Sequence, residues 1–239
     1  MPIQWLGNKQ EEYDKMMAGC SKMYPKPKRM CLQSELERVD MSLRQPSSMQ
    51  NYTELGFKKI KTPPAVWKLI QEFWEKNKDK PRMSENWPKG NTYVNHWDSP
   101  TTMVSVENKQ LRGGGQILKQ AIWDSARDTI QEWTGEELTE CSLYGIRVYS
   151  EGAVLATHVD RLPLVSSAIV QVAQDVDEPW PIEVYGHDGK AYNVTMEPGD
   201  MVLVSLFIVS CNSVFLAFIH FECMYSSLDT GYWMLSIEL

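Results

Sequence analysis

Residues 142–204 decide the fold: SLYGIRVYSEGAVLATHVDRLPLVSSAIVQVAQDVDEPWPIEVYGHDGKAYNVTMEPGDMVLV. Short apolar runs alternate in this stretch with turn sequences such as HDGK and EPGD, which is typical of strands joined by tight turns. Runs of this length and spacing predict a compact antiparallel β unit of the jelly-roll or barrel kind. We predict strands over 142–149, 153–157, 165–172, 182–185, 191–196 and 201–204.

Two amphipathic helices are predicted ahead of this β unit. Thr62 followed by Pro63 and Pro64 has the chemistry of a helix start, and an apolar pattern with helical spacing continues to about Asp79. A second apolar stripe indicates a helix from about Gln116 to Trp133. The stripes comprise Val66, Ile70, Phe73 and Trp74 in the first helix, and Leu118, Ala121, Ile122, Thr129, Ile130 and Trp133 in the second.

The predicted fold class is therefore α+β, mainly β, with N-terminal helices packed against the β unit. Residues 1–60 are polar and rich in Met, and we interpret them as a loosely packed arm with one helix. Residues 61–239 form the main domain, with a β core at about 140–205 and an atypically apolar tail at 201–239.

Composition excludes several classes of protein. At 43% hydrophobic, the 239 residues can bury a core. A net charge of -7 gives no general attraction to phosphate backbones, so nucleic acid is not an expected partner. Five cysteines without a C-x-x-C spacing suggest neither a disulfide framework nor a thiolate zinc site. With no signal-peptide segment among the first residues, we expect a cytoplasmic protein.

His158 and Asp160 are the candidate metal ligands. They stand where the predicted strand 153–157 ends, and strand alternation points both side chains to the same face. An imidazole and a carboxylate that leave coordination positions open suit Fe(II), which must also bind oxygen and a co-substrate. A solvated strand-end pair is the alternative interpretation. A second H-x-D, His96 to Asp98, stands in a predicted loop without a flanking strand, so we expect no metal role there.

The sequence around His158 resembles the prolyl-4-hydroxylase-like branch of the Fe(II)- and 2-oxoglutarate-dependent dioxygenases. In that branch a Tyr-x-x-Gly motif leads into the metal-binding H-x-D, as Tyr149 and Gly152 do here. The resemblance covers roughly 92–203 and includes the Pro-Gly-Asp turn before the last predicted strand. It implies a double-stranded β-helix (jelly roll), with His158 and Asp160 as two of three iron ligands and Tyr149 as a contact to 2-oxoglutarate.

The same resemblance implies an oxidoreductase. Such enzymes decarboxylate 2-oxoglutarate to succinate and carbon dioxide while dioxygen is consumed, and couple this to hydroxylation of a C–H bond. Ascorbate is the implied reductant, and a peptidyl proline or another protein is the implied substrate. The protein supplies geometry and a dry pocket, while the metal supplies the redox chemistry.

The chain departs from the family pattern after Asp200. Relatives place a distal histidine on the strand after the Pro-Gly-Asp turn and a Lys or Arg about ten residues beyond it, whereas here the only later histidine is His220 and the last basic residue is Lys190. His220 is the candidate third ligand, although its neighbours FIHFE resemble the closing strand of relatives. Arg147 or Arg161 would have to pair with the far carboxylate of 2-oxoglutarate. A catalytically impaired family member is therefore the alternative function.

The start of the tail offers a third interpretation. Residues 201–219 contain no charged side chain, which meets the length and apolarity expected of a membrane-spanning helix. Asn212 and several serines interrupt this run, and two core strands are the competing interpretation. A C-terminal membrane tether thus stands beside the two enzyme-like hypotheses.

Overall fold

The computed structural model describes residues 10–48, 51–160, 164–177, 181–205, 209–213 and 216–225. In the last two stretches it describes the backbone and, of the side chains, that of Cys223. The helices are α1 (Gln10–Met23), α2 (Met30–Arg44), α3 (Pro64–Asn77) and α4 (Gln116–Thr134), with a short 3-10 helix, η2 (Pro46–Ser48). The strands are β1 (Phe57–Lys61), β2 (Met83–Ser84), β3 (Thr102–Ser105), β4 (Leu138–Tyr149), β5 (Ala153–His158), β6 (Ser166–Gln174), β7 (Pro181–Tyr185), β8 (Ala191–Thr195), β9 (Asp200–Val204), β10 (Val209–Ser213) and β11 (Leu216–Tyr225).

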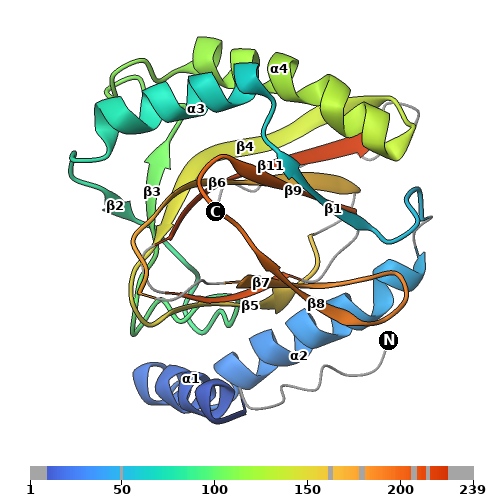
Figure 1. Cartoon of the computed structure of the whole chain (residues 1–239). Coiled ribbons are helices and arrows are strands. Elements are labelled where there is room, and N and C mark those ends of the chain that lie inside the picture. The colour runs from blue at the N-terminus through green and yellow to red at the C-terminus, as the bar shows by residue number, and fades with distance from the viewer. Residues whose placement is uncertain are drawn as a thin grey trace.

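These strands form two antiparallel sheets that face each other. The large sheet has seven strands in the order β1-β9-β6-β11-β4-β3-β2, and the small sheet has four in the order β5-β10-β7-β8. Figure 1 shows α3 and α4 over the outer face of the large sheet, and α1 and α2 on the far side of the small sheet. The predicted mixture of helices with antiparallel strands is confirmed, including all six strands predicted from 142 to 204.

The main hydrophobic core lies between the large sheet and the helices α3 and α4. The predicted α3 stripe is buried there as a whole, from Val66 to Trp74, and Ile122 and Ile130 of α4 pack against it. Leu118 and Trp133 contact the same core while partly exposed. Helix α4 ends at Gly135, whose φ of 74° is the left-handed conformation that glycine adopts without strain.

A second hydrophobic cluster fills the space between the two sheets. Strand β9 shows how one segment serves both cores: Met201 and Leu203 belong to the main core, whereas Val202 and Val204 belong to the second. This division follows from the two-residue repeat of a strand, and it explains why β9 is apolar at every position after Asp200. The second cluster also includes Tyr149, at the end of β4.

The N-terminal segment differs from the loose one-helix arm that we expected. Residues 10–48 form two helices, α1 and α2, and a disulfide joins Cys20 to Cys31 between them. The expectation that no cysteines pair was therefore wrong. Both cysteines are buried at the contact of the two helices, where their side chains meet. A spacing of 11 residues carries no local signal of this pairing, which depends on how the helices pack.

The apolar run at 201–219 contains β9, β10 and the start of β11, separated by residues outside the described ranges. Of the two interpretations of this run, the described backbone therefore agrees with strands. Among the described residues, none of the helices combines the length and apolarity needed to cross a membrane. Residues 226–239 of the tail lie outside the described ranges.

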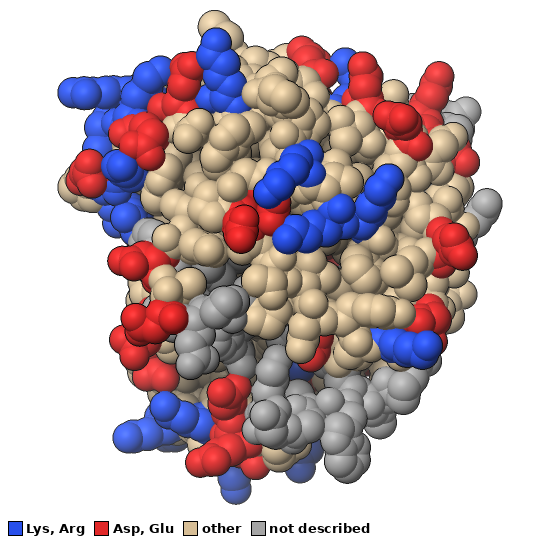
Figure 2. All heavy atoms as spheres, in the orientation of Figure 1, with Lys and Arg blue, Asp and Glu red and all other residues tan. Residues whose placement is uncertain are grey.

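Strand β1 was not predicted, because its sequence FKKIK is mostly polar. It lies at the edge of the large sheet, paired with β9 from Phe57↔Val204 to Lys61↔Asp200, and lysines are common on such edges because they discourage further strand pairing. Figure 2 shows a group of basic side chains over β1 in the centre of the face in view, with acidic and basic groups interspersed elsewhere.

Two of these lysines pair with Asp200, whose side chain is 1% exposed. Lys59 Nζ lies 2.8 Å from Oδ2, Lys61 Nζ lies 2.5 Å from Oδ1, and the Glu197 amide donates to Oδ2 at 2.9 Å. Burial alone would raise the pKa of this carboxyl, but the hydrogen bonds from Lys59, Lys61 and Glu197 outweigh it and lower the pKa from 3.8 to about 2. The ionised carboxylate thus joins β1 to the Pro-Gly-Asp turn.

We expect Asp200→Asn to lower the free energy of unfolding by about 1 to 2 kcal/mol at pH 7, an amount that allows for the solvent exposure of the two lysines. A depressed folded-state pKa gives stability that is complete above pH 4 and is lost as pH falls towards 2. Urea unfolding of both proteins at pH 7 and pH 3 should therefore show a smaller difference at pH 3. Asp40→Asn, in an exposed pair with Arg44, is the control. An undiminished difference at pH 3 would contradict this account.

Candidate functional site

The candidate site begins at the turn between β4 and β5. Tyr149 ends β4, and Gly152 takes a φ of 77°, a left-handed conformation that lets the chain reverse within three residues. The Ala153 amide closes this turn by donating to the Ser150 carbonyl at 3.0 Å. The Tyr-x-x-Gly motif is therefore a tight turn that directs β5 along the small sheet towards His158.

His158 and Asp160 come together as predicted. His158 Nε2 lies 3.9 Å from Asp160 Oδ1, within the distance of about 4 Å expected of two ligands to one ion. The side chains are 17% and 24% exposed. His158 Nδ1 lies 2.8 Å from the Ala156 carbonyl, and because a carbonyl only accepts, Nδ1 carries the proton. In the neutral ring the lone pair is then on Nε2, the atom nearer Asp160, which is the tautomer that metal coordination needs.

The large sheet contributes to the same site through Ser167 on β6. Ser167 Oγ donates to Asp160 Oδ2 at 2.8 Å, so the carboxylate is held at one oxygen while the other faces His158. The Tyr93 ring meets the His158 ring edge-on, with 5.5 Å between centroids. Sequence reasoning identified neither Ser167 nor Tyr93. A pair of serines in the mostly apolar strand 165–172 was the local signal for the first.

The side chains of His158 and Asp160 are of the kind that binds a divalent metal, but they supply only two donors. A neutral imidazole and a carboxylate are ligands of Fe(II) in sites that leave positions open, and bringing both atoms onto one ion requires a small closure from 3.9 Å. Within the described part of the chain, no group of three or more His, Cys, Asp or Glu side chains is placed to hold a metal ion.

The backbone of His220 lies on β11 of the large sheet, where it pairs with Ile169 of β6. His158 is on β5 of the small sheet, and the residue paired with it is Val209 of β10. The structure therefore does not place His220 on the strand beside His158. This position agrees with the interpretation of FIHFE as a closing strand, and it leaves the place across from His158 to a residue that cannot coordinate a metal.

Tyr149, the candidate 2-oxoglutarate contact, is 3% exposed within the cluster between the sheets. Of the two candidate cations, Arg147 is engaged with Glu85: its Nε and Nη2 lie 3.0 and 2.8 Å from Glu85 Oε1. The guanidinium also lies over the Trp87 ring, 5.7 Å from its centroid. Arg161 falls outside the described residues.

The second H-x-D, His96 to Asp98, lies among aromatic side chains. His96 Nε2 lies 3.1 Å from the Tyr24 hydroxyl, and the His96 and Trp97 ring centroids are 5.0 Å apart. Burial lowers the pKa of His96, which favours the neutral ring. As expected, these residues form a turn without a flanking strand, and the turn packs beside the end of α1.

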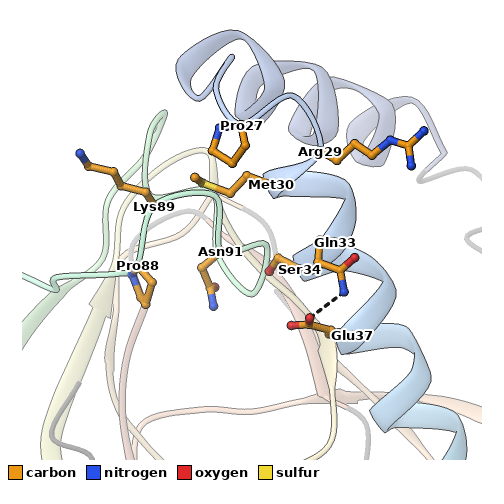
Figure 3. Close-up of a pocket in the computed structure, with 9 residues that line it drawn as sticks. All are labelled: Pro27, Arg29, Met30, Gln33, Ser34, Glu37, Pro88, Lys89 and Asn91. Carbon is orange, nitrogen blue, oxygen red and sulfur yellow. Dashed lines mark hydrogen bonds between the residues drawn. The ribbon is translucent and has the colours of Figure 1, made fainter.

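A surface cavity of about 540 Å³ lies elsewhere, between α2 and the loop at 88–91 (Figure 3). Met30 and Ser34 line it from the helix, and Pro88, Lys89 and Asn91 line it from the loop. None of the predicted site residues lines this cavity. We therefore do not assign the candidate chemistry to it.

No family model matches the sequence, and no curated protein matches it. Solved structures do resemble its fold. A Trichoplax adhaerens prolyl hydroxylase, in complex with a peptide fragment of the hypoxia inducible factor oxygen degradation domain, is 10% identical with a TM-score of 0.51, over 86% of this chain and 96% of that one. A 2OG-Fe(II) oxygenase family oxidoreductase from Burkholderia pseudomallei is 10% identical with a TM-score of 0.51, over 78% and 90%. AviO1 from Streptomyces viridochromogenes is 13% identical with a TM-score of 0.51, over 80% and 96%.

These comparisons define the class of fold. The chain has the fold of the prolyl hydroxylase and 2OG-Fe(II) oxygenase structures, and the resemblance seen in its sequence is confirmed at that level. Sequence identities of 10 to 13% show the fold alone and leave the activity to be argued from the site.

Proposed function

We propose that this chain is a Fe(II)- and 2-oxoglutarate-dependent dioxygenase domain of the prolyl-4-hydroxylase-like type, built on a double-stranded β-helix. The observation that carries the proposal is the His158 and Asp160 pair, 3.9 Å apart at the end of β5. Two facing antiparallel sheets with a metal-ligand pair at the end of one strand are the arrangement that this family implies.

Two residues would bind the metal, and other groups would hold these two ligands in place. His158 would donate through Nε2 and Asp160 through Oδ1, while the Ala156 carbonyl and the Ser167 hydroxyl fix the ring and the carboxylate in place. Bound Fe(II) would supply the activation of dioxygen that is coupled to decarboxylation of 2-oxoglutarate. Contacts of this kind to ligating side chains typically change metal affinity by about 10- to 100-fold.

The co-substrate and the substrate follow from the same proposal. Tyr149 would contact 2-oxoglutarate from the cluster between the sheets, and ascorbate would serve as the reductant. We propose a peptidyl proline or another protein segment as the substrate. The Trichoplax structure with a bound peptide supports a peptide substrate in a fold of this kind.

A second candidate function is a catalytically impaired member of the same class. The specific observation is that Val209, which has no metal-binding atom, pairs with His158 on the neighbouring strand. Arg147 is already paired with Glu85, so the described residues present no uncommitted arginine at this site for the dicarboxylate. Weak metal binding with little turnover would follow from these two features.

We expect the purified chain to convert 2-oxoglutarate to succinate very slowly or not at all. Two protein ligands hold Fe(II) weakly, and the described residues offer 2-oxoglutarate no uncommitted arginine for a charge-assisted bidentate pair. The measurement is succinate formation with Fe(II), ascorbate and 2-oxoglutarate. Robust turnover that disappears in His220→Ala would contradict this expectation and would make His220 the third ligand. Robust turnover unchanged in His220→Ala would instead require a different third donor.

A further inference from the structure

The strand that carries His158 lies at the edge of its sheet and needs support from outside the sheet. β5 is the terminal strand of the small sheet; β10 is its one neighbouring strand there, and on its other side it makes an isolated bridge between Leu155 and Val94. The register shifts between Val209 and Cys211, opposite Ala156 and Thr157, so the ladder is irregular just before His158. Backbone carbonyls at such a place require other hydrogen-bond partners when they are buried.

Helix α2 supplies these partners from the side. Arg38 Nη1 donates to the Thr157 carbonyl, and Gln45 Nε2 donates to the Asp160 carbonyl. Arg38 is 5% exposed and Gln45 is 8% exposed. The two contacts flank His158 and involve the backbone of Asp160 itself. Side chains of α2 and the residue after it therefore take the place of a neighbouring strand at the end of β5, while residues 93–95 contact its earlier part.

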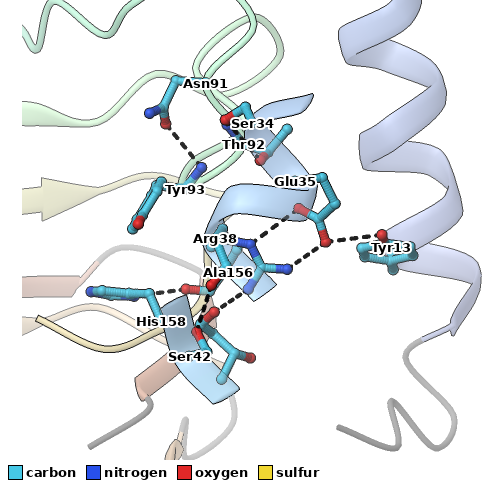
Figure 4. Close-up of polar contacts among 11 residues, drawn as sticks. Tyr13, Ser34, Glu35, Arg38, Ser42, Asn91, Thr92, Tyr93, Ala156 and His158 are labelled. Carbon is cyan, nitrogen blue, oxygen red and sulfur yellow. Dashed lines mark hydrogen bonds and ion pairs between the residues drawn. The ribbon is translucent and has the colours of Figure 1, made fainter. Parts of the chain in front are cut away.

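The position of Arg38 is fixed by a buried ion pair. Glu35, one turn earlier, is 4% exposed, and its Oε1 and Oε2 lie 2.5 Å from Nη2 and 3.1 Å from Nε of Arg38. Tyr13 of α1 donates to Glu35 Oε1 at 2.9 Å (Figure 4). Burial raises the pKa of Tyr13 to about 12, helped by the charge of Glu35 and the hydrogen bond to it. Burying an ion pair costs free energy, because both charges lose their hydration. The contact of this pair with the β5 backbone therefore suggests a role beyond packing.

The same helix holds the segment that covers His158. Ser34 Oγ accepts from the Thr92 amide at 3.1 Å and lies 3.2 Å from Thr92 Oγ1. Tyr93 follows, its carbonyl accepts from the Ala156 amide at 2.7 Å, and its ring contacts the His158 ring. Figure 4 shows Ser34 of α2 beside Thr92, with Tyr93 between Thr92 and His158. Both sides of His158 are thus tied to one helix.

We propose that α2 positions the candidate metal ligands, and that Arg38 and Gln45 are positioning residues that hold the Thr157 and Asp160 carbonyls. This inference rests on the proposed function, because it presupposes that His158 and Asp160 bind a metal. In this arrangement the ion pair with Glu35 directs the Arg38 guanidinium to the Thr157 carbonyl at the end of β5. His158 Nε2 and Asp160 Oδ1 thereby keep their positions relative to each other.

The test compares Co(II) affinity in variants that keep the helix folded. Glu35→Gln with Arg38→Met removes both charges together, keeps similar volumes and leaves Tyr13 an acceptor, which avoids a single unpaired buried charge. Gln45→Leu removes the other contact. Arg44→Met, in an exposed pair on the same helix, is the matched control. Ile122→Val, in the core on the opposite side of the large sheet, controls for a general loss of stability.

We expect the double variant and Gln45→Leu each to weaken Co(II) binding by about 10-fold or more, while both controls bind as the wild type does. Wild-type affinity in the double variant and in Gln45→Leu would overturn the inference. Equal weakening in Ile122→Val would show a structural role only and would overturn it too.

A second readout needs no metal. In the apo protein, the imidazole ¹⁵N resonances of His158 should show the single Nδ1-protonated tautomer, and the double variant should show a mixture. If the wild type fails to bind Co(II) through His158, the proposed function is wrong. The role of α2 is then tested by the His158 ¹⁵N resonances of the apo protein alone. An unchanged single tautomer in the double variant would then overturn the inference.

Discussion

The His158→Ala protein will lose bound Co(II) or Fe(II) under conditions in which the wild type retains it. His158 supplies one of the two donors that the described structure brings together, and removing it leaves a single carboxylate, Asp160, held by Ser167. We expect the dissociation constant to rise by at least about 100-fold, because one carboxylate does not compete with water for a divalent ion. Equilibrium dialysis followed by metal analysis is the measurement.

His96→Ala is the matched control for this experiment. It removes a histidine from the other H-x-D sequence, whose ring is committed to Tyr24 and Trp97. Metal content should stay at the wild-type level in this variant. Equal loss in both variants would point to unfolding or to a different site, and unchanged metal in His158→Ala would defeat the assignment of the ligands.

The Val209→His protein will bind Co(II) at least about 10-fold more tightly than the wild type. Val209 is paired with His158 across β5 and β10, and directly opposed residues of neighbouring strands share a face with Cβ atoms about 4.5 to 5.5 Å apart. An imidazole at this position adds a third donor of the kind that completes a 2-His-1-carboxylate set. Co(II) absorption during titration reports both the affinity and the change in ligand number.

Ser213→His tests the register on which this prediction depends. Ser213 is on the same strand but pairs with Ala153, at the opposite end of β5 from His158. It should leave Co(II) affinity unchanged. If Ser213→His strengthens binding and Val209→His does not, the strands pair in a different register at the site.

The β unit could be predicted from sequence because its signals are local. Each strand from Ser142 to Val204 alternates or is bounded by turn residues, and Gly152 and Gly135 take the left-handed conformations that their places in turns suggest. The helix at 116–134 was readable because one face of it is apolar along its length. Such patterns need no knowledge of what packs against them.

The N-terminal helices and the edge strand were not predicted correctly, because their positions depend on contacts with distant parts of the chain. Strand β1 is at the edge of the large sheet and carries three exposed lysines, so its pattern resembles a loop. Helix α2 buries Glu35 and Arg38, which a sequence-based reading assigns to a solvated face. Their burial depends on β5, more than a hundred residues later in the chain. The Cys20 and Cys31 pairing likewise depends on helix packing.

Within the site, the proximity of His158 and Asp160 was predictable from the sequence, and the position of a third ligand was not. His158 and Asp160 are two residues apart at the end of β5, so the two-residue repeat of a strand predicts that they share a face. The residue opposite them depends on how β10 pairs with β5, which is long-range register and is invisible in a local pattern. His220 was the candidate third ligand because it is the only histidine after Asp200. Its place on β11 of the large sheet is likewise set by long-range strand pairing.

The Cys20 and Cys31 disulfide changes what a cut in the chain can release. The segment it closes includes Pro25, Pro27 and the exposed basic residues Lys26, Lys28 and Arg29, the kind of exposed connector at which trypsin acts. A nick after Lys28 would leave α1 covalently attached to α2, so the Tyr13 contact to Glu35 would survive as a tethered, intramolecular contact. Only nicking followed by a thiol reductant would free α1 as a separate fragment. The connection between these helices is in this sense a ring and not a linear linker.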